Sequence, residues 1–269
     1  MKKNLLSIAL ISLITLTTSC SSSFFTLEEI IASGKLLVAT NAEFAPFEYK
    51  EGVKFKGIDM DIARAYGKYI DVEVLIRDMD FDAALLATSS NKTDFTIAGI
   101  TKNPARETTL SFTDSYYIAN QVVIVKENSK YVSCSTQEEL LISLSNDKAR
   151  IGCQRGTTGQ YYIEGNEDWD FDGITNSTCV VYDSGILAAT ALSNNQIDAI
   201  VIDQVPATIF VKNIKGIKVL DYILTEEEYA IAVSKGNDTL LESLNTFIAE
   251  IKENGVLDTI VGEYYGESK

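Results

Sequence analysis

The sequence predicts an α/β fold built from two similar lobes. After the first 25 residues, strand-like and helix-like segments alternate, which predicts mostly parallel sheets with helices on both faces. Residues 80–99 and 183–203 also share one order of features: an aspartate, an Ala/Leu-rich helix, a Ser-Asn turn, a second aspartate and an apolar strand. Chance similarity of two α/β units is the alternative explanation of this match.

The predicted elements follow one another along the chain. Apolar runs predict strands at 35–40, 72–78, 94–100, 150–154, 179–183 and 198–203. Helical patterns predict helices at 61–70, 81–90 and 186–194. Residues 116–125 and 225–233 are expected to be two extended connections between the lobes. The helical run 240–261 then returns to the first lobe, and Gly255 closes one helix there and starts the next.

The composition argues against several functions. The chain of 269 residues is 46% hydrophobic, which is enough for a core in one large domain or two small ones. Its formal charge of -15 repels a phosphate backbone, so nucleic acid is not an expected partner. The sequence has no histidine, which removes the commonest general base and zinc ligand. We therefore expect no catalytic residue, no metal site and no cofactor, although other side chains could still perform chemistry.

The first 20 residues are typical of the signal peptide of an exported lipoprotein. Met-Lys-Lys precedes an apolar run at 5–16 and the sequence Thr17-Thr18-Ser19-Cys20. A membrane-spanning helix is the alternative, but the run is shorter than the roughly 20 residues that a bilayer requires. "TTSC" resembles a bacterial lipoprotein cleavage box, with Thr17 where leucine is usual. We expect a lipid anchor on Cys20, a tether at 21–25, and a location at the outer face of the cytoplasmic membrane or in the periplasm.

Three further cysteines allow one disulfide. Cys153 and Cys179 lie in strand-like runs that could be neighbours in one sheet, and export permits oxidation. Cys134 would then keep its thiol. The alternative is three buried free cysteines, because a sequence does not give the distance that a bridge requires.

Polar residues follow the ends of strands in both predicted lobes. Ligands of open α/β sheets bind outside the carboxyl ends of the strands, so two facing lobes would form a binding cleft. Thr101 and Arg106 follow the predicted strand 94–100, and a guanidinium there can grip a carboxylate through two parallel hydrogen bonds. A solvated surface arginine is the alternative.

The second lobe offers complementary groups. Residues 150–161 form a strand, a glycine turn and a helix start whose free N–H groups attract an anion, and Thr158 could hold the same carboxylate. Asp203 follows the strand 198–203 and requires a cation, which a ligand ammonium would supply. Ordinary helix capping is the alternative for both. Arg106 and Asp203 together specify a zwitterion such as a free α-amino acid, and Phe44 and Phe81 could flank its side chain unless they belong to the core.

The chain resembles, over essentially its whole mature length, the amino-acid-binding family of bacterial ABC-transporter solute-binding proteins, extracellular solute-binding protein family 3. The segments that carry the resemblance are "LLVATNAEFAPFEY", "FKGIDMDIARAY", "DFDAALLA", "DFTIAGITKNPARETTLSFTDSYY", "RIGCQRGTTGQYY", "NNQIDAIVIDQVPA", "EEYAIAVSKGN" and "LNTFIAEIKENGVLDTIVGEYYG". It implies a two-lobed type II periplasmic binding protein fold, with mixed sheets and two hinge connections. Lobe 1 would comprise 26–118 and 228–269, and lobe 2 would comprise 121–224.

The resemblance also implies a function. The protein would be the monomeric substrate-binding component of an amino-acid ABC transporter, which captures a free L-amino acid by lobe closure and delivers it to the permease in the cytoplasmic membrane. An enzyme of the same fold, similar to cyclohexadienyl dehydratases, and a surface lipoprotein with an adhesion or sensing role are the alternatives.

Roles for individual residues follow from the same resemblance. Those expected at the ligand's backbone atoms are Arg106 for the carboxylate, with Thr101 and Thr158 assisting, and Gly99 and Asp203 for the α-ammonium. Ala98 and Thr157 are also expected to bind the ligand. Those expected around its side chain are Phe44, Phe81, Asn41, Asp59 and Gln154. Asn41 stands where many relatives, including binders of cationic amino acids, have aspartate, and Gln154 offers both a donor and an acceptor. Glutamine, arginine and lysine therefore all remain open as ligands.

Overall fold

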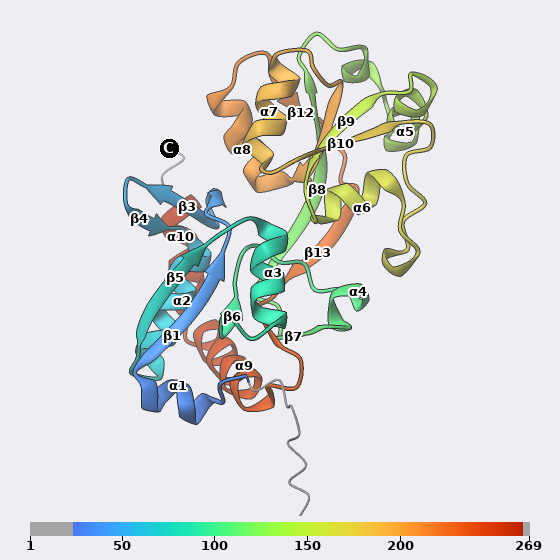
Figure 1. Cartoon of the computed structure of the whole chain (residues 1–269). Coiled ribbons are helices and arrows are strands. Elements are labelled where there is room, and N and C mark those ends of the chain that lie inside the picture. Colours follow the sequence, from blue (N-terminus) through green and yellow to red (C-terminus); the bar gives the residue numbers. More distant parts are fainter. Residues whose placement is uncertain (1–23, 266–269) are drawn as a thin grey trace, which may run out of the picture.

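The computed structural model describes residues 24–265, which form two lobes, each built on its own sheet (Figure 1). This confirms the predicted two-lobed α/β class. The predicted signal peptide at 1–20, its Cys20 and most of the tether at 21–25 lie outside the described residues. The limits of the two lobes along the chain stay a prediction.

The sheet of the first lobe has the strand order β5-β1-β6-β14-β7. Its strands are β1 (Lys35–Thr40), β5 (Glu73–Asp78), β6 (Phe95–Thr96), β7 (Leu110–Phe112) and β14 (Ala232–Ser234). β1 runs parallel to β5 and β6, whereas β14 runs antiparallel to β6 and β7. A smaller sheet contains β2 (Glu43–Phe44), β3 (Glu48–Glu51) and β4 (Lys54–Lys56).

Helices pack around the first sheet. They are α1 (Leu27–Ser33), α2 (Ile58–Tyr69), α3 (Phe81–Ser89), α4 (Pro104–Glu107), α9 (Asp238–Glu253) and α10 (Val256–Tyr265). α2 and α9 share one buried cluster with Leu36 and Val38 of β1, while α3 packs on β1 and β14. The predicted break at Gly255 is confirmed, because its φ of +76° separates α9 from α10.

The sheet of the second lobe has the order β10-β9-β11-β8-β12, and β13 also pairs with β8. Its strands are β8 (Tyr117–Lys126), β9 (Arg150–Gln154), β10 (Thr178–Tyr182), β11 (Ala199–Asp203), β12 (Ile217–Val219) and β13 (Thr225–Tyr229). β9, β10 and β11 are parallel, whereas β12 and β13 run antiparallel to β8 and β8 antiparallel to β11. Both sheets are thus mixed rather than mostly parallel, because the strands near the crossings between lobes run against the others.

Both faces of the second sheet are buried. The helices are α5 (Gln137–Asn146), α6 (Thr158–Glu164), α7 (Gly185–Ser193) and α8 (Gln204–Asn213), with short 3₁₀ turns η1 (Lys130–Ser133) and η2 (Glu167–Trp169). Alternate residues of β11 enter different clusters: Val201 packs with α5, whereas Ile200 and Ile202 pack with α7 and α8. This explains why β11 is apolar along its whole length until Asp203.

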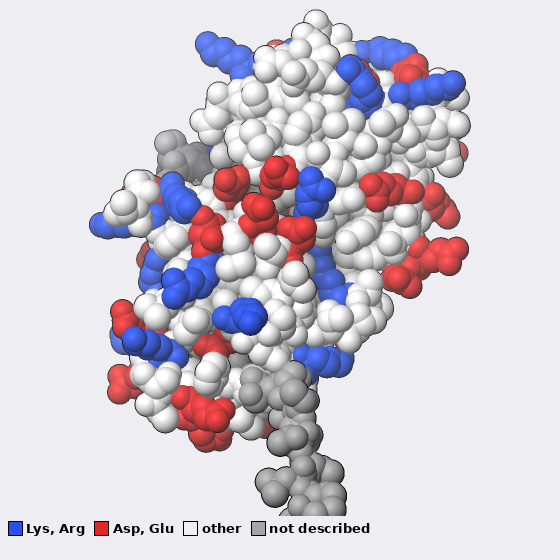
Figure 2. Space-filling view, in the orientation of Figure 1, with Lys and Arg blue, Asp and Glu red and all other residues white. Residues whose placement is uncertain are grey.

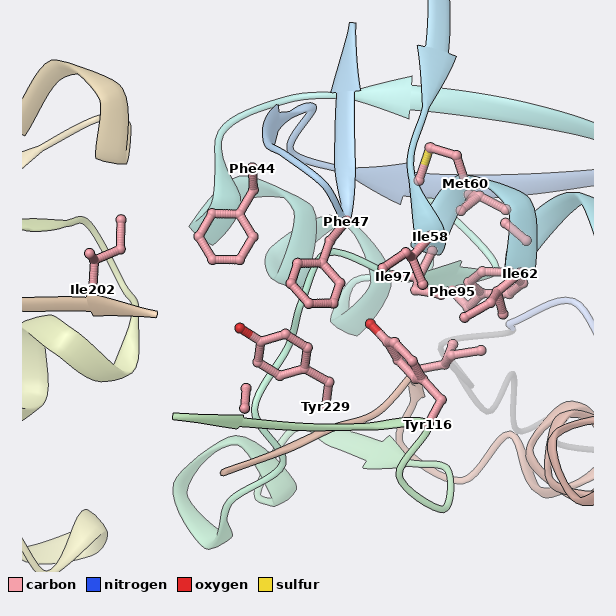
Figure 3. Packing of buried hydrophobic residues seen from close by; sticks show 14 of the residues in the cluster. Phe44, Phe47, Ile58, Met60, Ile62, Phe95, Ile97, Tyr116, Ile202 and Tyr229 are labelled. Carbon is pink, nitrogen blue, oxygen red and sulfur yellow. The ribbon is translucent and has the colours of Figure 1, made fainter. Parts of the chain in front are cut away.

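Two paired strands carry the chain between the lobes. β8 leaves the first lobe and β13 returns to it, and they are antiparallel partners from Tyr117↔Tyr229 to Gln121↔Thr225. The predicted extended connections are therefore confirmed. The Phe47 ring lies 5.1 Å from the Tyr229 ring (Figure 3), edge to face. It lies 4.9 Å from the Tyr117 ring, also edge to face, so aromatic contacts fix the crossing.

The described residues contain neither a membrane-spanning helix nor a cluster of metal ligands. No helix between residues 24 and 265 has the length and apolar character needed to cross a membrane. Within the same residues, no group of three or more His, Cys, Asp or Glu side chains could hold a metal ion.

The cysteine pair generates a first prediction. Cys153 and Cys179 lie on the adjacent strands β9 and β10, with their Sγ atoms 3.3 Å apart, while Cys134 lies near Ser143. After purification without reductant, peptide mass spectrometry should recover Cys153 linked to Cys179 and Cys134 as a free thiol. Reduction should lower the free energy of unfolding by about 3 kcal/mol. Three free thiols after treatment with a mild oxidant would contradict this prediction.

Candidate functional site

A narrow pocket lies between the two lobes. The residues that line it are Asn41, Phe44, Glu48, Phe81, Ala98, Gly99, Thr101, Arg106, Gln154, Thr157, Thr158 and Asp203. All the predicted ligand-binding residues except Asp59 are in this set, and Glu48 is added to it. Residues far apart in the sequence therefore meet at one place, where the carboxyl ends of strands from both sheets face each other.

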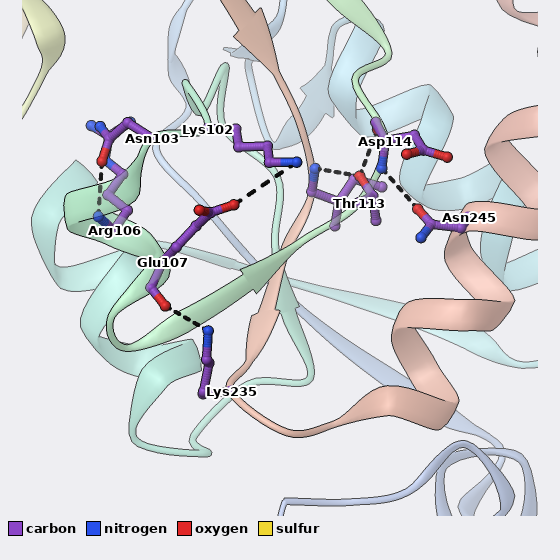
Figure 4. Close-up of polar contacts among 9 residues, drawn as sticks. Lys102, Asn103, Arg106, Glu107, Thr113, Asp114, Lys235 and Asn245 are labelled. Atoms are coloured by element: carbon purple, nitrogen blue, oxygen red, sulfur yellow. Dashed lines mark hydrogen bonds and ion pairs between the residues drawn. The ribbon is translucent and has the colours of Figure 1, made fainter. Parts of the chain in front are cut away.

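Arg106 is positioned by a short capped helix. Asn103 precedes α4, and its Oδ1 accepts a hydrogen bond of 2.8 Å from the Arg106 N–H, while Pro104 begins the helix with its fixed φ (Figure 4). At the other end, Lys235 donates to the carbonyl of Glu107 at 2.6 Å. These contacts fix the backbone of the turn, so the arginine side chain leaves it in a defined direction.

The guanidinium of Arg106 is buried without a carboxylate partner among the described residues. Nη1 donates to the Thr101 carbonyl at 2.6 Å and Nη2 donates to the Gly156 carbonyl of the second lobe at 2.9 Å. Its central carbon lies 5.3 Å from the Phe81 ring centre and 5.0 Å from the Trp169 ring centre. Burial lowers the pKa of Arg106 to about 10, so it stays cationic at neutral pH with donors left for an anion.

Asp203 provides the opposite charge at the end of β11. Its side chain does not cap α8, and its carboxylate instead accepts a hydrogen bond from the Tyr229 hydroxyl. Burial, and then the negative charge of Glu227, raise the pKa of Asp203 to about 7. Because a cation nearby would favour the ionised form, Asp203 is suited to an ammonium group.

Asp59 lies behind the pocket rather than in it. It is fully buried at the start of α2, and its two oxygens accept from the Gly99 N–H at 2.7 Å and from the Tyr116 hydroxyl at 2.8 Å. The prediction that Asp59 lines the pocket is therefore corrected: one of its oxygens holds the loop at Gly99 and the other accepts from Tyr116. That glycine has φ of +54°, and a Cβ there would lie 3.1 Å from the Phe44 ring.

Glu48 is a buried carboxyl group that does line the pocket. Only 1% of this residue is exposed, and it lies on β3 directly after Phe47. Burial raises the pKa of Glu48 well above its usual range, and the neighbouring charge of Asp59 adds to the effect. Burial also raises the pKa of Asp59 to about 6. This wall of the pocket is therefore acidic and poorly solvated.

The hydroxyls of Thr101 and Thr158 meet across the pocket. Thr158 lies in the first turn of α6 and Thr101 follows the first sheet, and their Oγ1 atoms are 3.2 Å apart. Both donate to the same Oε2 of Glu227, at 2.5 Å from Thr101 and 2.9 Å from Thr158. Glu227 lies on the connecting strand β13 and is buried.

Asn41 and Gln154 join the lobes at the other end of the pocket. The Gln154 Nε2 donates to the Asn41 Oδ1 at 2.8 Å, and the Asn41 Nδ2 donates to the Met79 carbonyl at 3.0 Å. These bonds leave the Gln154 Oε1 as an acceptor. The end of the pocket that should face a ligand's side chain is therefore suited to hydrogen-bond donors.

The glycine turn after β9 differs in part from its expected role. The Gly156 N–H donates to the Gln160 side chain at 2.8 Å, and the Thr157 N–H donates to the Gln154 carbonyl. These two groups are therefore occupied within the turn, so an anion there would be held by the Thr158 hydroxyl, by Arg106 and by the N–H groups of Thr158 and Gly159 at the start of α6. Close packing fixes the helix, since a Cβ on Gly159 would lie 2.7 Å from the Val201 carbonyl oxygen.

Sequence reasoning missed Glu48, Glu227 and Trp169. Glu227 is the middle of three consecutive glutamates, which look like a solvated face. Strand alternation does give a signal, because Glu227 must share its face with the buried Tyr229. Glu48 and Trp169 had no such signal, since each depends on contacts between segments that are distant in the sequence.

Comparison with known proteins places these features in a family. The model of the family described as bacterial extracellular solute-binding proteins, family 3, matches residues 36–267. The arginine-binding extracellular protein ArtP of Bacillus subtilis (strain 168) is 27% identical over 274 residues, covering 100% of both chains.

Solved structures are similar over most of the chain. A mutant of ArgBP from T. maritima has a TM-score of 0.79 and 29% identity, covering 89% of this chain and 99% of that chain. The amino acid ABC transporter substrate-binding protein AbpA from Streptococcus pneumoniae, bound to L-arginine, has a TM-score of 0.78 and 29% identity, covering 89% of this chain and 98% of that chain.

Asp203 generates a prediction about stability. Its pKa of about 7 in the folded protein exceeds its ordinary value of 3.8, so the folded state keeps a proton that the unfolded chain releases. The stability that this group contributes is present at low pH and is lost as pH rises towards 7. The free energy of unfolding of Asp203→Asn, relative to that of the unmodified protein, should therefore rise by about 2–3 kcal/mol between about pH 5 and pH 8. Urea unfolding measures this difference.

The matched control is Asp221→Asn, which removes one charge from an exposed site of the second lobe. Its difference from the unmodified protein should stay constant across the same pH range. An equally constant difference for Asp203→Asn would contradict the raised pKa.

Proposed function

The chain belongs to the bacterial extracellular solute-binding proteins of family 3, and from this premise we propose that it captures a free polar or basic L-amino acid for an ABC transporter. The observation that carries the proposal is that Arg106 and Asp203, which come from different lobes, line the same pocket. They are only 9% and 7% exposed. The carboxylate of the amino acid would bind Arg106, and its ammonium would bind Asp203.

A basic side chain, arginine first, has the best support among the open ligands. The pocket wall contains one guanidinium, that of Arg106, and two carboxyl groups, those of Glu48 and Asp203. The carboxyl groups of Asp59 and Glu227 lie directly behind this wall. Once Arg106 binds the ligand's carboxylate and Asp203 binds its ammonium, the remaining charged groups of the pocket are all acidic. The Gln154 acceptor adds to this, and the relatives named above include arginine-binding proteins.

The surface charge supports the same ligand class. Acidic side chains gather along the face where the two lobes meet (Figure 2), and the formal charge of the whole sequence is -15. Such a field attracts a cation towards the cleft and raises its rate of association. An anionic amino acid would be repelled on the same path.

Lobe closure is the proposed mechanism. Arg106 to Gly156 and Gln154 to Asn41 are hydrogen bonds between groups of different lobes, and Thr101 and Thr158, also of different lobes, both donate to Glu227. An amino acid held by Arg106 and Asp203 adds two charged contacts of the same kind, so it favours the closed form over an open one. We infer that the permease recognises this closed form, and that export and a lipid anchor on Cys20 keep the protein beside it.

A ligand screen tests the proposal. In thermal denaturation with each of the twenty L-amino acids, arginine, and more weakly lysine or glutamine, should raise the melting temperature. Trp169 is the only tryptophan of the sequence and lies 5.0 Å from Arg106, so its fluorescence should change with the same ligands. D-arginine is the matched control and should be inactive. Failure of all twenty amino acids in both measurements would refute the proposal and reopen the dehydratase and adhesion alternatives.

Arg106→Ala tests the carboxylate site directly. Removing a guanidinium that makes charge-assisted hydrogen bonds should weaken binding of the best ligand at least about a hundredfold in calorimetry. Arg155→Ala is the control, because Arg155 is an exposed arginine of the neighbouring turn, paired with Asp183 at 3.2 Å. The control should bind normally. Unchanged affinity in a folded Arg106→Ala protein would show that the carboxylate lies elsewhere.

A further inference from the structure

Glu227 is a buried carboxylate placed among the groups assigned to the ligand's carboxylate. Its Oε2 accepts from the hydroxyls of Thr101 and Thr158, at 2.5 and 2.9 Å, and its Oε1 accepts from the Thr225 hydroxyl at 2.7 Å. It has no Lys or Arg partner within ion-pair distance among the described residues. Its negative charge is held by hydroxyl groups and by the field of Arg106, whose pKa it raises against the effect of burial.

The number of hydroxyl hydrogens is the important constraint. Each threonine hydroxyl carries one hydrogen, and Thr101 and Thr158 both direct theirs towards Glu227. A ligand carboxylate can receive a hydrogen bond from these hydroxyls only if they turn away from Glu227. The two carboxylates would then share the same donors beside a single guanidinium.

We propose that Glu227 is an internal competitor of the ligand's carboxylate and thereby sets how strongly the pocket prefers a carboxylate over a neutral group at that position. The inference rests on the proposed function, since it assumes that an amino acid places its carboxylate between Arg106, Thr101 and Thr158. Glu227 acts through the two threonines and is a positioning residue.

Two further observations agree with this role. Glu227 and Tyr229 lie on the same face of β13, and Tyr229 holds Asp203 while Glu227 holds the hydroxyls. The charge of Glu227 also contributes to the raised pKa of Asp203. A neutral side chain at 227 would therefore favour both ends of an amino-acid zwitterion.

The test compares two ligands that differ only at the carboxylate. L-arginine and L-argininamide are titrated into the unmodified protein and into Glu227→Gln, with Trp169 fluorescence and calorimetry as readouts. The amide of the variant is a weaker acceptor for the hydroxyls, so the ratio of arginine to argininamide affinity should rise about tenfold. An unchanged or lower ratio in the folded variant overturns the proposal.

Controls come from the same strand. Glu226→Gln and Glu228→Gln remove the same charge from exposed positions on either side, and both should keep the ratio of the unmodified protein. Thr225→Val takes one donor from Glu227 and makes it depend more on Thr101 and Thr158, so this variant should lower the ratio about threefold. A rise in the ratio with Thr225→Val, or an equal rise with the exposed variants, also overturns the proposal.

The unmodified protein separates this inference from the function on which it rests. If it binds neither arginine nor any other amino acid, the proposed function fails and the competitor role fails with it. If it binds arginine and the ratio is unmoved in Glu227→Gln, only the role of Glu227 is lost.

Discussion

A buried guanidinium that reaches no carboxylate of the described chain is the constraint on which the site depends. Moving such a charge out of water is costly unless hydrogen-bond acceptors and nearby dipoles replace the lost hydration. Arg106 finds these in two backbone carbonyls and two ring faces, and one of each, Gly156 and Trp169, belongs to the second lobe. The groups that stabilise the charge therefore also connect the two lobes.

The strand pair that connects the lobes also supports the pocket. Tyr117 to Gln121 of β8 pair with Thr225 to Tyr229 of β13, and the inward side chains of β13 reach Asp203 and the two threonine hydroxyls. A change in the angle between the lobes must pass through these residues. The polar groups of the pocket are consequently oriented by the segment that would bend, and their geometry is coupled to closure.

Much of this arrangement could be predicted from the sequence, because one rule covers it: polar residues that follow buried strands meet at the carboxyl edge of a sheet. Thr101, Arg106 and Asp203 follow from that rule, and the resemblance to a family added the facing of the two lobes. Residues whose role depends on a partner far along the chain were not accessible in this way. Asp59 was expected in the pocket wall but lies behind it, where it accepts from the Gly99 N–H. Glu227 looks solvated in the sequence until the pairing of its strand is known.

The carboxyl groups around the pocket also explain how one site can be both acidic and stable. Burial raises the pKa of Glu48, Asp59 and Asp203, so part of the negative charge is held as protonated acid rather than as repelling carboxylates. A cationic ligand reverses this balance by favouring the ionised forms, at the cost of releasing protons. Under the proposed function, the raised pKa values would limit repulsion within the fold, and a bound cation would draw these carboxyl groups towards their ionised forms.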